Sequence, residues 1–308
     1  MTTYRGVTTS YRSTASQPTY LVASRRRAKR SLSLLSALLV TLGLVAVGVV
    51  PASAATTKKY HASLGTLTAT LTYQGTYPEA HGAVLTITSS GRVQYRSAVT
   101  SSFCGDLCWP QSTGYGGAPN PLQVVKLSVG APVVILGLYS GGAHCCFIDE
   151  IFAPSTTTTY SKTEVFLGDP GAQLKKLPGG QWPVFVSADD SFAYTFTDYA
   201  ASGLPVKILR FENHHVVIVT RHYRRVVSLD AQGWLHAFYD QASSHYADSV
   251  GVIAAWTADE YLLGRASNAE TFLREQAAAG HLNSLLNPSV KGLVFVTQLN
   301  KFLHQRGY

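Results

Sequence analysis

The sequence predicts a mainly β protein that ends in an α-helical part. Residues 60–220 contain about ten short segments in which apolar and polar residues alternate or apolar residues cluster, as expected of strands. Past Arg221 the apolar residues recur every three or four positions, which is typical of amphipathic helices. Thr and Tyr are plentiful and only 14% of residues are charged, a composition that suits an exported β protein.

The first 54 residues have the organisation of an export signal. Seven basic and no acidic residues occur in this segment, and all seven precede the apolar stretch of residues 31–50. An Ala-x-Ala site at Ala52–Ala54 follows, so we expect a signal peptide over residues 1–54 and a secreted, extracellular protein. The alternative is a membrane anchor over residues 31–50, because this stretch is about as long as a bilayer-spanning helix.

Removal of the signal leaves an almost neutral protein. The whole chain contains 25 Lys and Arg against 17 Asp and Glu. Without the seven basic residues of the signal, 18 basic and 17 acidic side chains remain, a net charge of +1. This balance argues against nucleic acid as a partner, and we expect membrane contact only through an uncleaved signal. The chain has no phosphate loop, Gly-x-Ser-x-Gly elbow or His-Glu-x-x-His zinc helix, so we expect no cofactor.

Residues 55–223 are expected to form a β-rich domain. Alternation begins at Leu64–Tyr73, and the turn residues Ser89–Gly91 indicate a hairpin. Richer apolar runs at 124–129 and 133–139 are expected to be buried strands. Further strands are expected at residues 147–152, 163–167, 184–187, 192–196, 206–211 and 216–219. Many short strands without a long intervening helix favour antiparallel sheets, arranged as a sandwich or a propeller-like array.

A weak internal repeat favours the propeller-like arrangement. Lys126-Leu127 followed by Pro132-Val133 is matched 50–51 residues later by Lys176-Leu177 followed by Pro183-Val184. Each copy precedes an apolar strand. One four-stranded propeller blade occupies about 40–50 residues, so the period of this repeat fits a blade.

Residues 224–308 are expected to form a small helical bundle. Apolar stripes with helical spacing occur at residues 231–238, 250–261, 272–277 and 292–303. Gly264 and Gly280 mark the ends of two of these helices. Ser267–Glu270 resembles a capping box that would begin the third helix.

The four cysteines lie within 43 residues and form the most distinctive motif of the chain. Residues 139–146 read YSGGAHCC, with Cys145 and Cys146 at the end, and Cys104 and Cys108 precede this run. Four cysteines in an exported protein predict two disulfides. Adjacent cysteines are poorly placed for a bond, so we expect cross-links between the two segments, either 104–145 with 108–146 or 104–146 with 108–145.

Two other interpretations of the cysteine motif remain open. The sulfurs together with His144 could coordinate zinc or copper in a tetrahedral site. A Cys–His nucleophile is the third interpretation, although the sequence shows no acid that would orient the histidine.

The region of this motif resembles a known family. The run LYSGGAHCC at 138–146 is similar to a motif of secreted bacterial proteins related to the integrin-type FG-GAP/VCBS propeller repeats. VSADDSFAY at 186–194 is similar to these proteins as well, and the resemblance extends from about residue 120 to 308. It implies a propeller-like fold and no activity. The family usually has an acidic calcium loop before the motif, but the matching loops 127–133 and 177–184 lack acids, so we expect no bound metal.

Two functions from different classes remain. The leading hypothesis is a secreted, non-catalytic binding or structural protein, stabilised by disulfides, whose partner is a glycan, a peptide or a cell-surface component. We expect Tyr139, His144, Asp189 and Asp190 to contribute to binding and no residue to be catalytic. The alternative is a secreted hydrolase with a site near His144 and the acidic pairs Asp149-Glu150 and Asp189-Asp190. A hydrolase requires that these side chains converge in one concave pocket.

The signal organisation leads to a prediction about processing. We expect the secreted protein to begin at Ala55, because cleavage follows the Ala-x-Ala site. N-terminal sequencing of the protein from the culture medium and from the membrane fraction measures this. A membrane-bound form that retains residues 31–50 would show an anchor instead.

Overall fold

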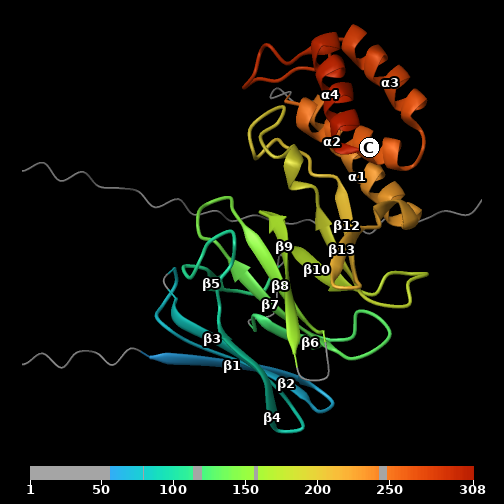
Figure 1. Ribbon diagram of the computed structural model, residues 1–308. Coiled ribbons are helices and arrows are strands. Elements are labelled where there is room, and N and C mark those ends of the chain that lie inside the picture. The colour runs from blue at the N-terminus through green and yellow to red at the C-terminus, as the bar shows by residue number, and fades with distance from the viewer. Residues whose placement is uncertain (1–55, 79, 114–119, 156–158, 243–247) are drawn as a thin grey trace, which may run out of the picture. The chain divides into compact units, whose positions relative to one another are not determined.

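The computed structural model describes residues 56–78, 80–113, 120–155, 159–242 and 248–308 (Figure 1). The strands of these residues form three antiparallel sheets, and four α-helices follow the last strand. This confirms the predicted fold class, mainly β with a C-terminal helical part. Residues 53–308 belong to one compact unit.

The first sheet is a meander in which consecutive strands are neighbours, in the order β1-β2-β3-β4. Its strands are β1 (Thr57–Leu64), β2 (Leu67–Gln74), β3 (His81–Ser89) and β4 (Arg92–Ala98). The hairpin expected at Ser89–Gly91 is confirmed. The single strand expected at Leu64–Tyr73 is wrong at its start, because Gly65, with φ of +62°, turns the chain between β1 and β2.

The second sheet lies in the middle of the structure. Its strands are β5 (Trp109–Pro110), β6 (Leu122–Val125), β7 (Val133–Tyr139), β8 (Phe147–Pro154) and β9 (Tyr160–Gly168). Their order is β5-β7-β8-β9, and β6 also pairs with β7. Every residue of β7 is buried, because other layers cover both faces of this sheet.

The third sheet repeats the meander of the first. Its strands are β10 (Ala172–Lys175), β11 (Val184–Ala188), β12 (Val206–Glu212) and β13 (His215–Ile218). The two copies of the internal repeat lead into β7 and β11, each of which follows the short strand that it pairs with, β6 or β10. The repeated residues therefore occupy equivalent positions in two sheets.

The strand expected at residues 192–196 is wrong. Asp190–Phe192 forms a short 3-10 helix, η1, and turns follow it. The side chains of Phe192 and Phe196 both belong to the apolar core of the C-terminal helices. The expected strand would place both side chains on one face of a sheet. In the structure they enter the helical core from a turn instead.

The three sheets are stacked face to face with apolar cores between them (Figure 1). Leu71 and Leu85 of the first sheet share one core with Leu136 of β7. A second core joins Ile135 of β7 to Phe185 of β11. Alternate residues of β7 thus enter opposite cores, as the pleat of a strand requires. Of the two arrangements expected from the sequence, the described sheets show the sandwich-like one.

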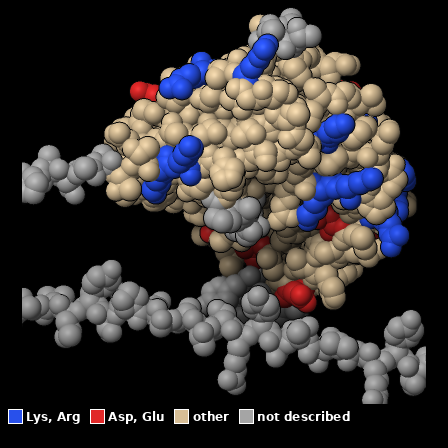
Figure 2. All heavy atoms as spheres, turned by 90° about the horizontal axis from the view of Figure 1, so that it is seen from below, with Lys and Arg blue, Asp and Glu red and all other residues tan. Residues whose placement is uncertain are grey.

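Figure 2 views the molecule from the side of the first sheet. Lys and Arg side chains stand in several separate groups on this face, between wide areas of uncharged surface. Few acidic side chains are visible among the described residues there. The basic residues on this side therefore do not merge into one patch.

Four helices follow the third sheet, and α1 and the end of α2 pack on its outer face. The helices are α1 (Arg224–Ala242), α2 (Val250–Leu262), α3 (Ala266–Ala278) and α4 (Gly292–Arg306), and a short 3-10 helix, η2 (Thr220–His222), precedes them. Ile208 of β12, Val227 of α1 and Leu263 share an apolar core. None of the helices in the described ranges is long and apolar enough to cross a membrane.

The capping box expected at Ser267–Glu270 is wrong. Helix α3 already begins at Ala266, and its N-cap, Arg265, makes no side-chain capping bond. The backbone N–H of Arg265 instead donates to the carbonyl of Glu260, 2.8 Å away, in the turn that ends α2. The turn at Gly264 therefore leads directly into α3, and Ser267 lies inside the first turn of the helix.

The disulfide connectivity expected from the sequence is also wrong. Cys104 pairs with Cys108, and Cys145 pairs with Cys146, so both bonds are local. Cys108 directly precedes β5 and Cys146 directly precedes β8, while β7 lies between these strands. Two strand spacings separate such positions by roughly 10 Å, whereas a disulfide needs Cα atoms within about 7 Å. The middle strand therefore keeps the two segments apart.

A close backbone contact joins the loop after η1 to α2. A Cβ atom on Gly251 would lie 2.1 Å from the carbonyl oxygen of Ala201, and one on Gly203 would lie 2.9 Å from the carbonyl oxygen of Gly251. Only glycine leaves room for this approach. Gly233 on α1 differs, because a Cβ there would have nothing within 4 Å.

We predict opposite effects of the same substitution at these two helical glycines. Gly251→Ala should destabilise the protein by about 1–3 kcal/mol, because the added methyl group collides with backbone that cannot move aside. Gly233→Ala should stabilise it by about 0.5–1 kcal/mol through helix propensity. Urea unfolding followed by circular dichroism measures both. Equal effects of the two substitutions would contradict the close contact at Gly251.

Candidate ligand-binding site

Two cavities lie beside Asp189, where the third sheet meets the end of α4. Each has a volume of about 330 Å³. We call them the Tyr308 cavity and the Asp190 cavity. Asp189, Lys207 and Arg306 line both. The Tyr308 cavity is further lined by Val206, Ile218, Val219, Thr220, Arg221, His222, Leu262, Gly307 and Tyr308. The Asp190 cavity is further lined by Phe166, Leu167, Ser187, Ala188, Asp190, Ser191 and Leu209.

Asp189 is positioned by the end of β11. Its backbone N–H donates to the carbonyl of Pro205, 2.8 Å away, just beyond the last β11–β12 pair. Its carboxylate accepts a bond of 3.2 Å from the N–H of Ser191, which makes Asp189 the N-cap of η1. Aspartate is a preferred N-cap, because its oxygen satisfies an N–H that has no partner within the helix.

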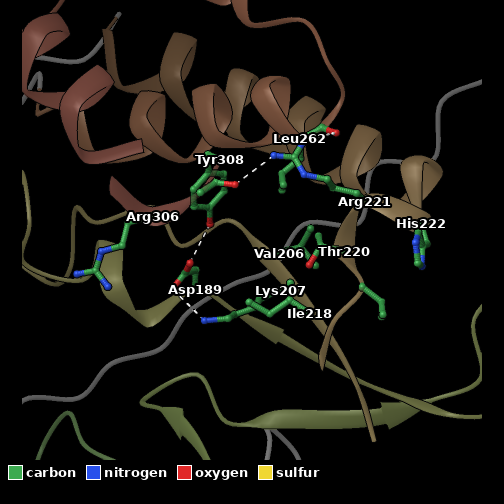
Figure 3. A pocket seen from close by; sticks show the side chains of 12 residues that line it. Asp189, Val206, Lys207, Ile218, Thr220, Arg221, His222, Leu262, Arg306 and Tyr308 are labelled. Atoms are coloured by element: carbon green, nitrogen blue, oxygen red, sulfur yellow. Dashed lines mark hydrogen bonds and ion pairs between the residues drawn. The ribbon is translucent and has the colours of Figure 1, made fainter. Parts of the chain in front are cut away.

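Lys207 and Tyr308 hold the carboxylate of Asp189 from two sides (Figure 3). Lys207 Nζ lies 3.4 Å from Oδ1, and the Tyr308 hydroxyl donates to Oδ2 over 2.9 Å. Burial raises the pKa of Asp189, but the charge of Lys207 and the hydrogen bonds from Tyr308 and Ser191 outweigh it, so the pKa lies below its ordinary value. Asp189 is therefore ionised at neutral pH, and Lys207 balances its charge.

Two arginines line the Tyr308 cavity, and they have different surroundings. Arg221 donates to the carbonyls of Tyr261, Leu262 and Gly307 at 3.3–3.4 Å, so its guanidinium caps the C-terminal end of α2. Arg306 lies over the ring of Phe302, 5.3 Å from its centroid. Among the described residues, no carboxylate pairs with Arg306.

Asp190 faces the second cavity. Its Oδ1 accepts a bond of 3.2 Å from the backbone N–H of Asp169. Burial and the charges of Asp169 and Asp189 raise the pKa of Asp190, and these effects exceed the lowering by that hydrogen bond and by Lys207. The pKa values of the two neighbouring acids thus shift in opposite directions, because Asp189 has a cationic partner and Asp190 has none in contact among the described residues.

The structure separates the four residues that were expected to contribute to binding. Asp189 and Asp190 line the cavities, whereas Tyr139 and His144 lie elsewhere. The Tyr139 hydroxyl donates to the carbonyl of Gly142 in the turn after β7. His144 is exposed, and its ring stacks on Tyr199 with centroids 4.3 Å apart.

The acidic pair Asp149-Glu150 lies on β8, away from both cavities. Asp149 is buried and accepts a bond of 3.0 Å from Thr113, while Glu150 pairs with Lys162 at 2.7 Å. Burial raises the pKa of each carboxyl to about 7. The two side chains have separate partners, as expected for neighbours on a strand. The hydrolase hypothesis requires that His144 and the acidic pairs converge in one pocket. In the structure they do not converge.

Lys207, Arg306 and Tyr308 line the Tyr308 cavity but were not expected from the sequence. Lys207 stands in the expected strand 206–211 as an alternating polar residue, which was the available signal. Arg306 and Tyr308 follow the last helical stripe. Nothing in their local sequence indicates that they line a cavity with Asp189, or that Tyr308 bonds to Asp189, 119 positions away. No group of three His, Cys, Asp or Glu within the described ranges is arranged to hold a metal ion.

The fold and the cavities define a stacked β-sheet protein with a ligand-sized cavity at its sheet–helix junction. The chain is 25% identical over 150 residues to the uncharacterized protein y4bJ of Sinorhizobium fredii, which covers 48% of this chain and 24% of that protein. It is 26% identical over 160 residues to the probable thylakoid lumen protein sll0997 of Synechocystis sp., covering 48% of this chain and 47% of that protein. The matches thus span less than half of each relative. No protein-family model and no solved structure matches the chain.

A second pair of carboxyls lies on α1 and α2. Asp230 on α1 accepts bonds from the backbone N–H of Val206, at 2.8 Å, and from Trp234 Nε1, at 3.0 Å. Asp259 on α2 is fully buried, and neither of its oxygens accepts a bond from a described N–H or O–H group. Burial, together with the charge of Asp230 and a hydrogen bond to it, raises the pKa of Asp259 to about 10. Asp259 is therefore protonated at neutral pH.

We predict that Asp259 makes the stability of the protein depend on pH. The folded protein retains a proton that the unfolded chain releases near pH 4, so stability should fall as pH rises from about 4 to 10, by up to about 1.4 kcal/mol per unit. Asp259→Asn is uncharged at every pH and should remove this slope. The variant should match the wild type near pH 4 and be more stable at pH 8.

Urea unfolding at several pH values measures this effect. Glu275→Gln on the exposed side of α3 is the control, and it should leave the slope unchanged. A wild-type slope that persists in Asp259→Asn would contradict a buried, protonated Asp259.

Proposed function

We propose that this protein is an exported, non-catalytic binding protein that takes a small organic anion in the Tyr308 cavity. The single observation that carries the proposal is the charge of Arg306 at the cavity wall. The charge of Asp189 is balanced by Lys207, and Arg221 is engaged by carbonyl groups. A positive charge therefore remains available to a ligand, and the cavity attracts anions.

The other walls of the cavity support a ligand with an apolar body. Val206, Ile218 and Leu262 line it, and its volume of about 330 Å³ lies at the lower end of typical small-molecule sites. A ligand of this size has room for one ring or a short chain. Arg306 would bind its acidic group, since a guanidinium offers paired donors to a carboxylate.

Several observations support a location outside the cytoplasm. Residues 1–54 have the organisation of an export signal, and two local disulfides are present. The relative sll0997 is named as a probable thylakoid lumen protein, and the thylakoid lumen is also a compartment outside the cytoplasm. We further propose kinship with the FG-GAP/VCBS repeats. The equivalent places of the repeated residues before β7 and β11 support it.

We expect benzoate to bind and its uncharged and cationic analogues not to bind. Benzoate at millimolar concentration should raise the melting temperature, because a ligand that binds only the folded state stabilises it. Benzamide and benzylamine have the same ring and serve as matched ligands. Arg306→Gln should abolish the benzoate effect, whereas Arg92→Gln on the exposed β4 should retain it.

Thermal unfolding followed by isothermal titration measures this binding. The proposal fails if benzoate gives no shift, if benzamide gives an equal shift, or if Arg306→Gln binds benzoate as well as the wild type does.

A further inference from the structure

A third cavity differs from the two beside Asp189 in its charge. It has a volume of about 510 Å³ and lies among β10, β11, α1 and the loop that joins β11 to β12. Tyr199 and Trp234 contribute aromatic rings to its wall, and Pro170 and Leu204 contribute apolar groups. None of the described residues that line it is charged. We call it the Trp234 groove.

Both aromatic side chains of the groove are oriented through their polar ends. Trp234 Nε1 donates to Asp230 over 3.0 Å, and the Tyr199 hydroxyl donates to Asp169. These bonds engage the indole N–H of Trp234 and the hydroxyl hydrogen of Tyr199, and they hold both rings in place. A ligand would meet aromatic surface, which favours apolar C–H groups.

Two further rings continue the aromatic surface from Tyr199. The ring of His144 stacks on Tyr199 at 4.3 Å, and the ring of Tyr194 lies 5.5 Å from Tyr199 between centroids. Tyr194 is 58% exposed. The three rings therefore form an exposed cluster that shares Tyr199 with the groove, so a chain-like ligand could contact both.

Tyr194 is held in an unfavourable backbone conformation. Its φ is +59°, in the left-handed region that bulky residues rarely adopt. The bond from its backbone N–H to Ser202 Oγ, at 3.1 Å, holds the turn, and Ser202 Oγ itself donates to the carbonyl of Asp198. A strained backbone conformation persists only where the surrounding structure maintains it, and such positions are common at functional sites. Here it keeps an aromatic ring at the surface.

We propose that the Trp234 groove and the exposed cluster bind a neutral glycan. The apolar face of a sugar ring fits an aromatic ring, and its hydroxyl groups need neutral hydrogen-bond partners. Ser187 lines the groove, and its hydroxyl, which donates to Gly171, retains acceptor capacity. Asp169, which accepts the hydroxyl bond of Tyr199, and the exposed Asp198 next to Tyr199 in sequence carry negative charge near the rings and disfavour acidic glycans. This site goes beyond the anion cavity and uses none of its charged residues.

Titration calorimetry with neutral hexasaccharides of glucose, mannose and N-acetylglucosamine tests the proposal. We expect at least one of these neutral hexasaccharides to bind the wild type. Hexagalacturonate, the acidic analogue, should not bind. Tyr194→Asn removes the exposed ring and suits the left-handed backbone, and it should weaken binding roughly 3- to 10-fold. Tyr239→Asn removes a half-exposed ring from α1 and should leave binding unchanged.

A second variant tests the groove itself. Trp234→Ala should weaken binding more than Tyr194→Asn does, and circular dichroism checks that it folds. The glycan site is overturned if no neutral hexasaccharide binds, if hexagalacturonate binds equally well, or if Tyr194→Asn and a folded Trp234→Ala both bind like the wild type. Benzoate binding is measured on the same variants and should be unchanged, so failure of this site is distinct from failure of the anion cavity.

Discussion

Burial of the middle sheet on both faces is the constraint on which the other layers depend. Each residue of β7 is buried, and alternate side chains enter different cores. A strand with two apolar faces needs cover on both sides, which the first and third sheets provide. The third sheet has the same need on its outer face, where Ile208 and Val219 meet Val227 of α1. The helices, and the cavities beneath them, follow from that requirement.

Much of the fold could be predicted from residue periodicity. Runs such as Val133–Tyr139 are apolar throughout because they are buried on both faces, and the hairpin at Ser89–Gly91 has turn residues between alternating segments. The errors arose where a local pattern has a second explanation. The apolar residues Phe192 and Phe196 fit the pattern of a strand, but both side chains enter the core of the C-terminal helices from a turn. The propeller relationship stays a prediction, since the same meanders also build stacked sheets.

The candidate site was predictable only in part. Asp189 and Asp190 attract notice as adjacent acids, and both line cavities. The residues that decide their chemistry come from β12 and the end of α4, so the contacts depend on packing between distant segments. His144 shows the reverse case, because its motif is conspicuous in the sequence. Its ring is bound into an exposed cluster with Tyr199 rather than into a reactive pair with a cysteine.

The local pairing of the cysteines has a consequence for where the chain can fold. A bond that closes a loop of five residues restricts the unfolded chain by only about 2 kcal/mol, against roughly 4 kcal/mol for the 40-residue loops of a cross-linked arrangement. Neither bond ties one sheet to another. The sheets are held to one another by their apolar cores, and neither disulfide links those layers. We therefore expect recombinant protein without the export signal to assemble its core even in a reducing cytoplasm, with no oxidoreductase to guide it.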